Sequence, residues 1–493
     1  MQDDSSLVLT IDIGSSSVRV KLFTSEGRRL EGVGSRTSYA LRTTPDGGAE
    51  LDPELMLDRI FAAIDRTLSR AGDMARRIAG VGVCSLVSNV LGLDSRGDPV
   101  TPIYTWADTR CAAEAEQLRD SMDEALVRER TGCYLHPTYL PARLLWLQRT
   151  MPDVYERTAN WVSLGDLITL RLFGHVGQSL SVASWGGLLN RHTLDWDGWL
   201  LSTLNLDREK LPPLVDVDDT FSGLRPEYAE RWPMLRHVPW LPCVGDGAAS
   251  NVGSGCYTPD KFAVQIGTSA ALRAIVPLTP AQVPHGLWCY RLDRHASVLG
   301  GALSEGGNVF NWLRHLLNTD DMASLEEAAF RLPPDSHGLT VLPLVAGERS
   351  PGWHTSARAT ITGLSLSTGQ AELLRAAQES ISYRLGIVYD LLAGELAPPS
   401  TIAASGGALL KVRGWLQMLA DVLGRPVSIP TEPEASSRGV ALLALRVLGL
   451  IPDFSALPTP MRGTYKPDMH RHAIYRRAMQ RQQALYDLIY RTK

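Results

Sequence analysis

The chain has 493 residues, of which 44% are hydrophobic and 21% charged, so two large domains with substantial cores are expected. Its formal net charge of −4 argues against a nucleic-acid binder, whose basic surface would neutralise phosphates. The six cysteines form no Cys-x-x-Cys pair, which argues against a zinc site or a disulfide framework. No apolar run approaches the ~20 residues that span a bilayer, and the acidic N-terminal segment lacks the order of a signal peptide, so we expect a cytoplasmic protein.

The N-terminal half opens with a predicted strand, tight turn and strand over residues 7–23. Its apolar run reaches Gly14, three serines follow, and the alternation of apolar and polar residues then resumes. A helix is predicted over residues 52–69, because Asp52 can cap its first turn and apolar residues recur on one face. Residues 81–93 indicate further strand structure.

The same pattern of strand, turn and strand returns at residues 262–276. The two turns lie about half the chain apart and have matching sequences, Ile13-Gly14-Ser15-Ser16 and Ile266-Gly267-Thr268-Ser269. A duplicated domain explains this spacing better than a short repeat does. We therefore expect an N-terminal domain over residues 1–252 and a C-terminal domain over residues 253–493.

The C-terminal half adds helices predicted over residues 415–423 and 438–448. Strands and helices alternate along the whole chain, so the predicted fold class is α/β. The basic stretch of residues 470–481 indicates a solvated helix face rather than an anion site.

The two Gly-Ser/Thr turns are candidate phosphate-binding sites. Glycine lets a turn approach a phosphate closely, and backbone N–H groups with Ser or Thr hydroxyls supply hydrogen-bond donors. One such turn is common in ordinary hairpins, whereas two matching turns, each opening one half, could hold one polyphosphate between them. The predicted phosphate contacts are Gly14, Ser15, Ser16, Gly267, Thr268 and Ser269.

Two aspartates are candidates for the chemistry beside these turns. Asp12 precedes the first turn, where a carboxylate is favourable next to phosphates only if a cation such as Mg²⁺ lies between them. Asp246 lies between two glycines at a predicted strand end, where it can orient an acceptor hydroxyl and take its proton. We predict Asp246 as the catalytic base, and Asp12 with Asp246 as metal ligands. From spacing alone, Asp246 is equally explained as an ordinary turn aspartate, and the alternative for Asp12 is a strand-end aspartate that caps its own turn.

Trp106, Asp108 and Arg110 form a candidate site for a polyol. They alternate, so on an extended segment they would share a face. An indole can stack on a carbon chain, a carboxylate accepts hydroxyl protons, and a guanidinium can bind oxygens through two N–H groups. An exposed Asp–Arg pair beside a half-buried tryptophan is the alternative. Gly406-Gly407 would let the backbone lie against a planar ring such as adenine, or would simply begin a helix.

In this order, the motifs resemble the FGGY family of carbohydrate kinases, within the sugar kinase/Hsp70/actin ATPase fold. The resemblance runs from Leu9 to about Leu448 and implies two duplicated actin-like (ribonuclease H-like) domains that close over Mg²⁺, ATP and a sugar. It implies that Gly406, Gly407 and Ala408 contact the adenosine. The segments that carry it are residues 12–16 and 266–269 (phosphate motifs), 106–110 (sugar motif), 245–247 (catalytic base), 405–408 (adenosine loop) and 359–364 with 372–379 (C-terminal signature).

Further segments are similar to the gluconokinase branch of that family. They are residues 131–137, 300–302, 306–308 and 347–353, of which the last also occurs in xylulokinase relatives and discriminates poorly. The resemblance implies a substrate contact for His136 and an ATP contact for Asn308. Arg110 is the candidate clamp for a carboxylate or a terminal hydroxyl.

The chain departs from the family where it would meet the sugar. Ser88 stands where relatives usually carry a histidine, and Asn89 could take over the hydrogen bond of that histidine to the substrate. Glu305, with Ser304 before it, replaces an asparagine pair and, if it faces the site, would disfavour a carboxylate such as gluconate. The adenosine loop has Val412 where a serine is frequent.

Together these observations predict an ATP-dependent kinase that acts on a primary hydroxyl of a small sugar or sugar acid. D-Gluconate is the first choice of substrate, and a ketopentose such as xylulose or another polyol is the alternative. ATP and Mg²⁺ are the expected cofactors, no nucleic-acid or membrane partner is expected, and a homodimer stays open. An actin- or Hsp70-type ATPase that needs no sugar, and a sugar sensor without catalysis, are the rival hypotheses.

Overall fold

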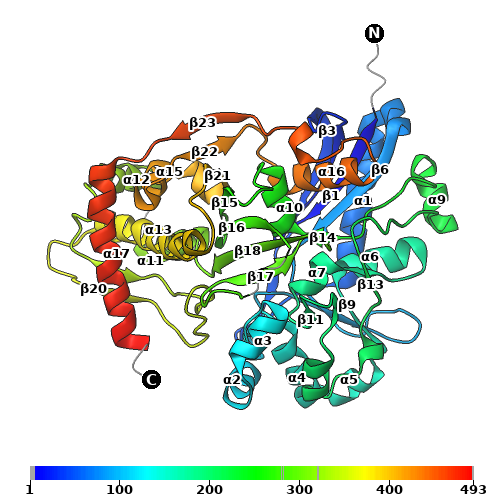
Figure 1. Cartoon of the computed structure of the whole chain (residues 1–493), viewed down its shortest axis with the longest axis horizontal. Coiled ribbons are helices and arrows are strands. Elements are labelled where there is room, and N and C mark those ends of the chain that lie inside the picture. The colour runs from blue at the N-terminus through cyan, green and yellow to red at the C-terminus, as the bar shows by residue number, and fades with distance from the viewer. Residues whose placement is uncertain (1–5, 279, 281, 319–320, 413, 491–493) are drawn as a thin grey trace, which may run out of the picture.

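The computed structural model describes residues 6–278, 280, 282–318, 321–412 and 414–490, and its two large sheets lie one in each half of the chain (Figure 1). The strands of the first sheet are β1 (Leu7–Ile13), β2 (Ser17–Thr24), β3 (Arg29–Ser38), β6 (Ile78–Ser85) and β14 (Val244–Gly245). Those of the second are β15 (Lys261–Ile266), β16 (Ala270–Pro277), β17 (Trp288–Arg291), β18 (Ala296–Leu303), β21 (Thr401–Ser405), β22 (Val427–Pro430) and β23 (Met461–Tyr465).

The two sheets share one topology. The first has the order β14-β6-β1-β2-β3, and the second contains the matching order β22-β21-β15-β16-β18, with β23 and β17 added at its edges. In each half the opening hairpin is antiparallel, and its first strand pairs in parallel with a later strand, β6 or β21. The duplication predicted from the two turns is therefore confirmed, and the fold is the two-domain α/β fold that was expected.

Two short helices, equivalent in the duplication, join the halves at their centre. Helix α10 (Asp246–Gly253) follows β14, and helix α16 (Ala435–Val447) follows β22. The two helices pack against each other, while α16 also covers β1 and β6 of the opposite half and α10 contacts β15 and β16. A Cβ atom on Gly439 would lie 1.7 Å from the carbonyl oxygen of Ala249, and one on Gly253 would lie 1.9 Å from that of Ala435. Only glycine allows the two backbones to approach this closely.

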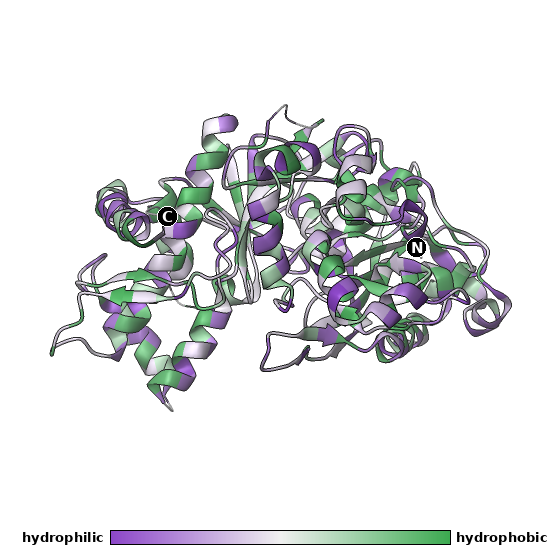
Figure 2. Ribbon diagram, turned by 90° about the horizontal axis from the view of Figure 1, so that it is seen from below, coloured by the Kyte–Doolittle hydropathy of each residue, from purple (hydrophilic) through white to green (hydrophobic). Residues whose placement is uncertain are grey.

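Longer helices cover the outer faces of the sheets. Helix α1 (Pro53–Ala71) packs on β2 and β3, and the Asp52 carboxylate caps it by accepting from the Leu55 N–H at 2.8 Å. Helix α13 (Gln370–Glu395) packs on β16 and β18, with α15 (Trp415–Leu423) and α17 (Met469–Tyr490) against it. Many of the helices are banded green and purple in Figure 2, as helices with one apolar face should be.

Helix α17 contains the basic stretch at residues 470–481. Tyr475, Ala478 and Met479 are buried against the C-terminal half, while most of the basic side chains of that stretch are exposed. The stretch is therefore the solvated face of a packed helix, as predicted. Within the described residues, no helix is both long and apolar enough to cross a membrane.

Each half has its own hydrophobic core, and a third core joins them. The joining core combines residues of β6, α10 and α16 with Trp185, Trp288 and Tyr290. Because apolar side chains from both halves fill it, the two sheets are held in a fixed arrangement around the space between them.

Candidate active site

A cleft of about 800 Å³ lies between the two halves and brings most of the predicted residues together. Both Gly-Ser/Thr turns line it, with Asp12 and Asp246 beside them. Gly406, Gly407, Ala408 and Val412 line one region of the same cleft, and Trp106 and Ser88 line another. Segments that are far apart in the sequence thus surround one solvent-accessible space.

The first phosphate turn joins β1 to β2, and the second joins β15 to β16. A backbone hydrogen bond closes each turn, from Gly14 N–H to Ser17 O at 3.1 Å and from Gly267 N–H to Ser269 O at 2.9 Å. A Cβ atom on Gly267 would meet no atom within 4 Å, and one on Gly14 would meet only the Ser17 oxygen at 3.8 Å. Both glycines therefore border open space, which fits a polyphosphate approaching the backbone.

Asn308 supports the second turn instead of lining the cleft. It lies in the first turn of α11 (Gly307–Leu317), where its N–H donates to Thr268 O at 3.1 Å. Its Oδ1 accepts from the Gly306 N–H at 2.8 Å. Asn308 thus positions the turn predicted to bind phosphate, and a direct ATP contact of Asn308 stays a prediction.

The adenosine loop depends on one glycine at the start of α14 (Gly407–Lys411). Gly406 has a φ of 97°, and a Cβ on it would lie 2.4 Å from the oxygen of Ile266 in β15. Only glycine combines this conformation with so close an approach. Gly407 meets nothing within 4 Å, so its Cα faces free space where a planar ring could lie.

Asp246 is the first residue of α10 and is partly exposed to the cleft. Burial raises the pKa of its carboxyl to about 7, the negative charge of Asp12 adds to this rise, and Arg273 opposes it. The Arg273 guanidinium packs over the same turn, since a Cβ on Gly247 would lie 2.3 Å from its Nη1. A carboxylate with a pKa near neutrality beside an open cleft is suited to accept a hydroxyl proton.

Asp12 is 1% exposed and belongs to a polar cluster formed by both halves. Arg19 forms an ion pair with it at 3.2 Å, and the Ser437 hydroxyl of α16 donates to the same carboxylate oxygen at 3.0 Å. Burial raises the pKa of Asp12, and Arg19 opposes this rise. The buried Asp12 carboxylate raises the pKa of the partly exposed Asp246. Two carboxylates this close are a donor set that a hard divalent cation would stabilise, so the residues fit Mg²⁺.

A wall of aromatic side chains lines the part of the cleft beyond the predicted adenosine loop. Tyr290 stacks on two indoles, with ring centroids 4.0 Å from Trp185 and 4.2 Å from Trp288, and the two indoles themselves lie 5.2 Å apart. Tyr139, Trp353 and Trp106 line the same region. Such a surface can cover the carbon chain of a sugar.

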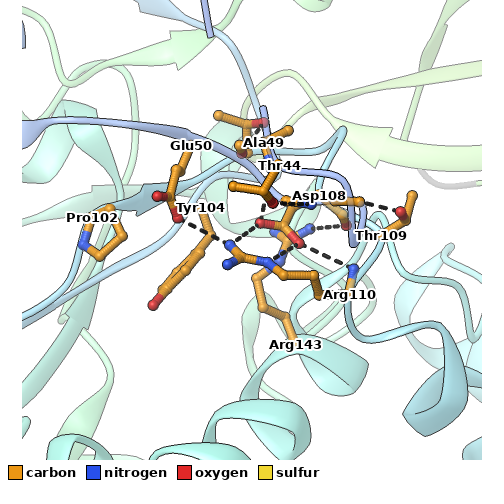
Figure 3. A network of polar contacts seen from close by, with 12 residues as sticks. Thr44, Ala49, Glu50, Pro102, Tyr104, Asp108, Thr109, Arg110 and Arg143 are labelled. Atoms are coloured by element: carbon orange, nitrogen blue, oxygen red, sulfur yellow. Dashed lines mark hydrogen bonds and ion pairs between the residues drawn. The ribbon is translucent and has the colours of Figure 1, made fainter. Parts of the chain in front are cut away.

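Trp106 reaches the cleft, whereas Asp108 and Arg110 form a network outside its lining (Figure 3). Arg110 donates to Asp108 through Nε at 3.1 Å and to Glu50 through Nη2 at 3.0 Å. Asp108 also accepts from the Ala49 N–H at 3.2 Å. The segment is a turn, not a strand, so the expectation that the three residues share an extended face is wrong.

Of the three other predicted substrate contacts, one lines the cleft and two do not. Ser88 lines the cleft, and its hydroxyl donates to the oxygen of Trp185 at 2.6 Å. Asn89 is buried outside the cleft lining, bonded to Leu86 O and Leu164 N–H. His136 is also buried outside that lining, and burial with nearby Arg349 lowers the pKa of its imidazole to about 3. A direct substrate contact of Asn89 or His136 stays a prediction.

Sequence reasoning missed the arginines that line the cleft, among them Arg273 and Arg349. Arg273 interrupts the apolar strand β16, and Arg349 belongs to the Gly-Glu-Arg-Ser-Pro-Gly-Trp segment at 347–353. A charged residue within an otherwise buried strand was a usable signal for Arg273. For Arg349 the motif was visible, but the cleft that it faces is formed only by folding.

Comparison with known proteins agrees with this geometry. Residues 7–253 match the N-terminal domain, and residues 262–448 the C-terminal domain, of the FGGY family of carbohydrate kinases. Gluconokinase of Bacillus subtilis (strain 168) is 29% identical over 476 residues, covering 94% of this chain and 91% of the relative. Xylulose kinase of Escherichia coli (strain K12) is 27% identical over 482 residues, covering 95% and 96%.

A solved structure gives the same result. The crystal structure of gluconate kinase from Lactobacillus acidophilus matches with a TM-score of 0.88 at 26% identity, covering 98% of both chains. With family matches over both halves and a cleft that contains the family's motifs, the chain belongs to the FGGY family of carbohydrate kinases.

Proposed function

We propose that this carbohydrate kinase transfers the γ-phosphate of ATP to a primary hydroxyl of a small sugar or sugar acid, and that its substrate is D-gluconate, giving 6-phosphogluconate. The observation that carries the transfer is Asp246, a carboxylate with a pKa near 7 in a cleft that both phosphate turns line. Gluconate is supported by the similarity to gluconokinases and by Arg273 and Arg349, two of the arginines that line the cleft.

In this proposal the residues of the cleft divide the tasks of binding and proton transfer, and Asp246 takes part in both. The turns at Gly14 and Gly267 hold the phosphates through backbone N–H groups, and the loop at Gly406 holds the adenosine. Asp246 orients the acceptor hydroxyl and takes its proton as the bond to phosphorus forms. Mg²⁺, held by Asp12 and Asp246, would offset the phosphate charge when bound.

Xylulose or another ketopentose is the second candidate. The similarity to xylulose kinases supports it, and the replacement of the family's asparagine pair by Ser304 and Glu305 would weaken binding of an acid if Glu305 were ionised.

A coupled assay of ADP release over D-gluconate, D-xylulose, D-ribulose, glycerol and erythritol tests the proposal. The highest kcat/KM is expected with D-gluconate, and ADP release without a sugar should be slow. A preference for a neutral sugar would replace gluconate by that sugar. Fast ADP release without any sugar would favour the actin- or Hsp70-type ATPase, and no turnover with any sugar would favour the sensor.

A further inference from the structure

Arg349 projects into the cleft from the loop between β19 (Thr340–Leu342) and β20 (Thr360–Thr362). Its guanidinium carbon lies 4.8 Å from the ring centroid of Trp106, which belongs to the other half of the chain. Its Nη2 donates to the carbonyl oxygen of Leu303. The guanidinium is thus held from two sides, while its Nε is buried with no hydrogen-bond partner.

Other groups in the cleft share this lack of a partner. The indole nitrogens of Trp185 and Trp353 and the Nε of Arg273 are buried and make no hydrogen bond to the described residues, although the three side chains line the cleft. Indole and guanidinium N–H groups donate and cannot accept. Those atoms have almost no exposed surface, so the part of this set that a ligand can reach is the partly exposed side chain of Arg349, whose guanidinium favours acceptor oxygens. A carboxylate, which is acceptor-only when ionised, is the strongest such group.

Asp246, Arg273 and Arg349 all line the cleft, so a linear acid can meet both a carboxylate and a guanidinium there. Arg273 interacts electrostatically with both Asp246 and Arg349, whereas Arg349 interacts with Glu305, Tyr290 and Tyr139. An aldonic acid has its carboxylate at one end of the carbon chain and its primary hydroxyl at the other. With the hydroxyl at Asp246, the carbon chain would extend past Arg273 towards Arg349.

Neighbouring arginines outside the cleft lining are already bound to protein oxygens. Arg110 is held by Asp108 and Glu50, and the Nη1 of Arg119 donates to the carbonyl oxygen of Trp353 at 2.9 Å. Arg349 is therefore better placed than either to receive an acid group of the acceptor.

Glu305 lies behind this site in the loop between β18 and α11. It is 1% exposed, it does not line the cleft, and its Oε1 has no hydrogen-bond partner. It interacts electrostatically with Arg349, although no ion pair joins these two described side chains. An ionised Glu305 would compensate the charge of Arg349, and a protonated Glu305 leaves that charge for a ligand.

We propose that Arg349, held against Trp106, binds the carboxylate of an aldonic acid substrate, and that Glu305 behind it sets the preference between acidic and neutral acceptors. This inference rests on the proposed gluconate kinase function and names the specificity-determining residue of that site.

The test compares D-gluconate with D-xylulose as acceptors for the wild-type enzyme, Arg349→Met, Arg349→Lys and the control Arg119→Met. Calorimetry with sodium gluconate in the absence of ATP measures binding directly, and circular dichroism with thermal unfolding checks the fold. Arg349→Met should lower kcat/KM for gluconate by about 100-fold, mainly through KM, because a charge-assisted bond is lost. For xylulose, the loss of kcat/KM in Arg349→Met should stay below about tenfold. For gluconate, kcat/KM of Arg349→Lys should be about tenfold higher than that of Arg349→Met.

The outcomes separate the two proposals. A wild-type enzyme that prefers xylulose to gluconate refutes the proposed substrate before any variant is made, and the carboxylate site with it. If the wild type prefers gluconate but Arg349→Met lowers kcat/KM for both acceptors by the same factor, the carboxylate assignment alone is wrong. Arg119→Met should change kcat/KM for both acceptors by the same factor, since it removes a contact between the halves and Arg119 does not line the cleft.

Discussion

Ser437, the third residue of α16, donates a hydrogen bond to Asp12 near the end of β1, with Oγ 3.0 Å from Oδ2. Glu434, just before the same helix, forms an ion pair with Arg19 at 3.4 Å, and Arg19 in turn pairs with Asp12. The carboxylate predicted to lie beside the metal is therefore oriented by a helix of the opposite half. The position of Asp12 therefore depends on how the two halves pack against each other.

Replacement of Ser437 by alanine should lower kcat/KM for Mg²⁺·ATP by about tenfold, because a hydrogen bond to a charged group is lost. Steady-state kinetics at saturating acceptor and varied Mg²⁺·ATP measures this effect. Ser380→Ala is the matched control, since Ser380 is a buried helix serine whose hydroxyl donates to the backbone oxygen of Ala377. An unchanged KM for Mg²⁺·ATP in Ser437→Ala would show that Asp12 does not depend on Ser437.

Asp246→Asn should reduce kcat by about 10²–10⁴-fold and leave ATP binding intact, because an amide cannot take the hydroxyl proton. The midpoint of thermal unfolding should not fall, since the substitution removes a carboxylate whose ionisation burial disfavours. Single-turnover kinetics and calorimetric ATP binding measure both points. Asp73→Asn, on an exposed side chain, is the control, and activity within a few-fold of wild type in Asp246→Asn would refute the base assignment.

Gly439→Ala should destabilise the protein by about 1–3 kcal/mol, because its Cβ would overlap the backbone of Ala249 and force α10 and α16 apart. KM for ATP should rise in the same variant, since these helices set the cleft. Gly394→Ala is the matched control: a Cβ there meets nothing within 4 Å, and in helix α13 alanine should stabilise by about 0.5–1 kcal/mol. Denaturant unfolding compares the two, and equal stabilities would contradict the close packing.

Arg110→Met should lower the free energy of unfolding by about 3 kcal/mol, because it leaves the buried carboxylate of Asp108 without its counter-charge and Glu50 with only the exposed Arg42. KM for gluconate, measured well below the unfolding temperature, should change by less than about threefold, since Arg110 does not line the cleft. A stable variant with a tenfold higher KM would instead support the clamp that the sequence suggested for Arg110.

Glu305 should make the affinity for gluconate depend on pH. Burial raises the pKa of its carboxyl to about 8, Arg349 and Arg384 oppose this rise, and Glu348 adds to it. The side chain is therefore neutral below pH 8 and becomes negative as the pH rises through 8, next to the arginine proposed to bind the substrate. KM for gluconate should then increase between pH 7.5 and about 9.

The Glu305→Gln variant isolates this effect. Glutamine is neutral at every pH, so KM for gluconate should stay flat over the same range and should equal the wild-type value near pH 7. KM for xylulose should be flat in both proteins and serves as the internal control. A wild-type KM for gluconate that does not change with pH would show that ionisation of Glu305 does not weaken gluconate binding at Arg349. A rise in KM that persists in Glu305→Gln would show the same.

The fold was predicted from local patterns because local forces form its elements. The two hairpins follow from an apolar run, a glycine and renewed alternation, and they are observed as β1–β2 and β15–β16. Helix α1 begins where Asp52 was expected to cap it. The strand structure expected over residues 81–93 is observed as β6 and β7 (Leu91–Leu93), with Ser88 at a φ of 53° in the loop between them.

The sequence alone determined the duplicated architecture, the two phosphate turns and the candidate base Asp246, since each rests on residues adjacent in the chain. Only the tertiary structure decided which charged side chains meet the acceptor, because that depends on pairings between distant segments. Arg110 pairs with Glu50 and Asp108 and lies outside the cleft lining, whereas Arg349 lies over the ring of Trp106 and lines the cleft. A guanidinium binds whichever acceptors folding brings within reach, and motif spacing does not encode those acceptors.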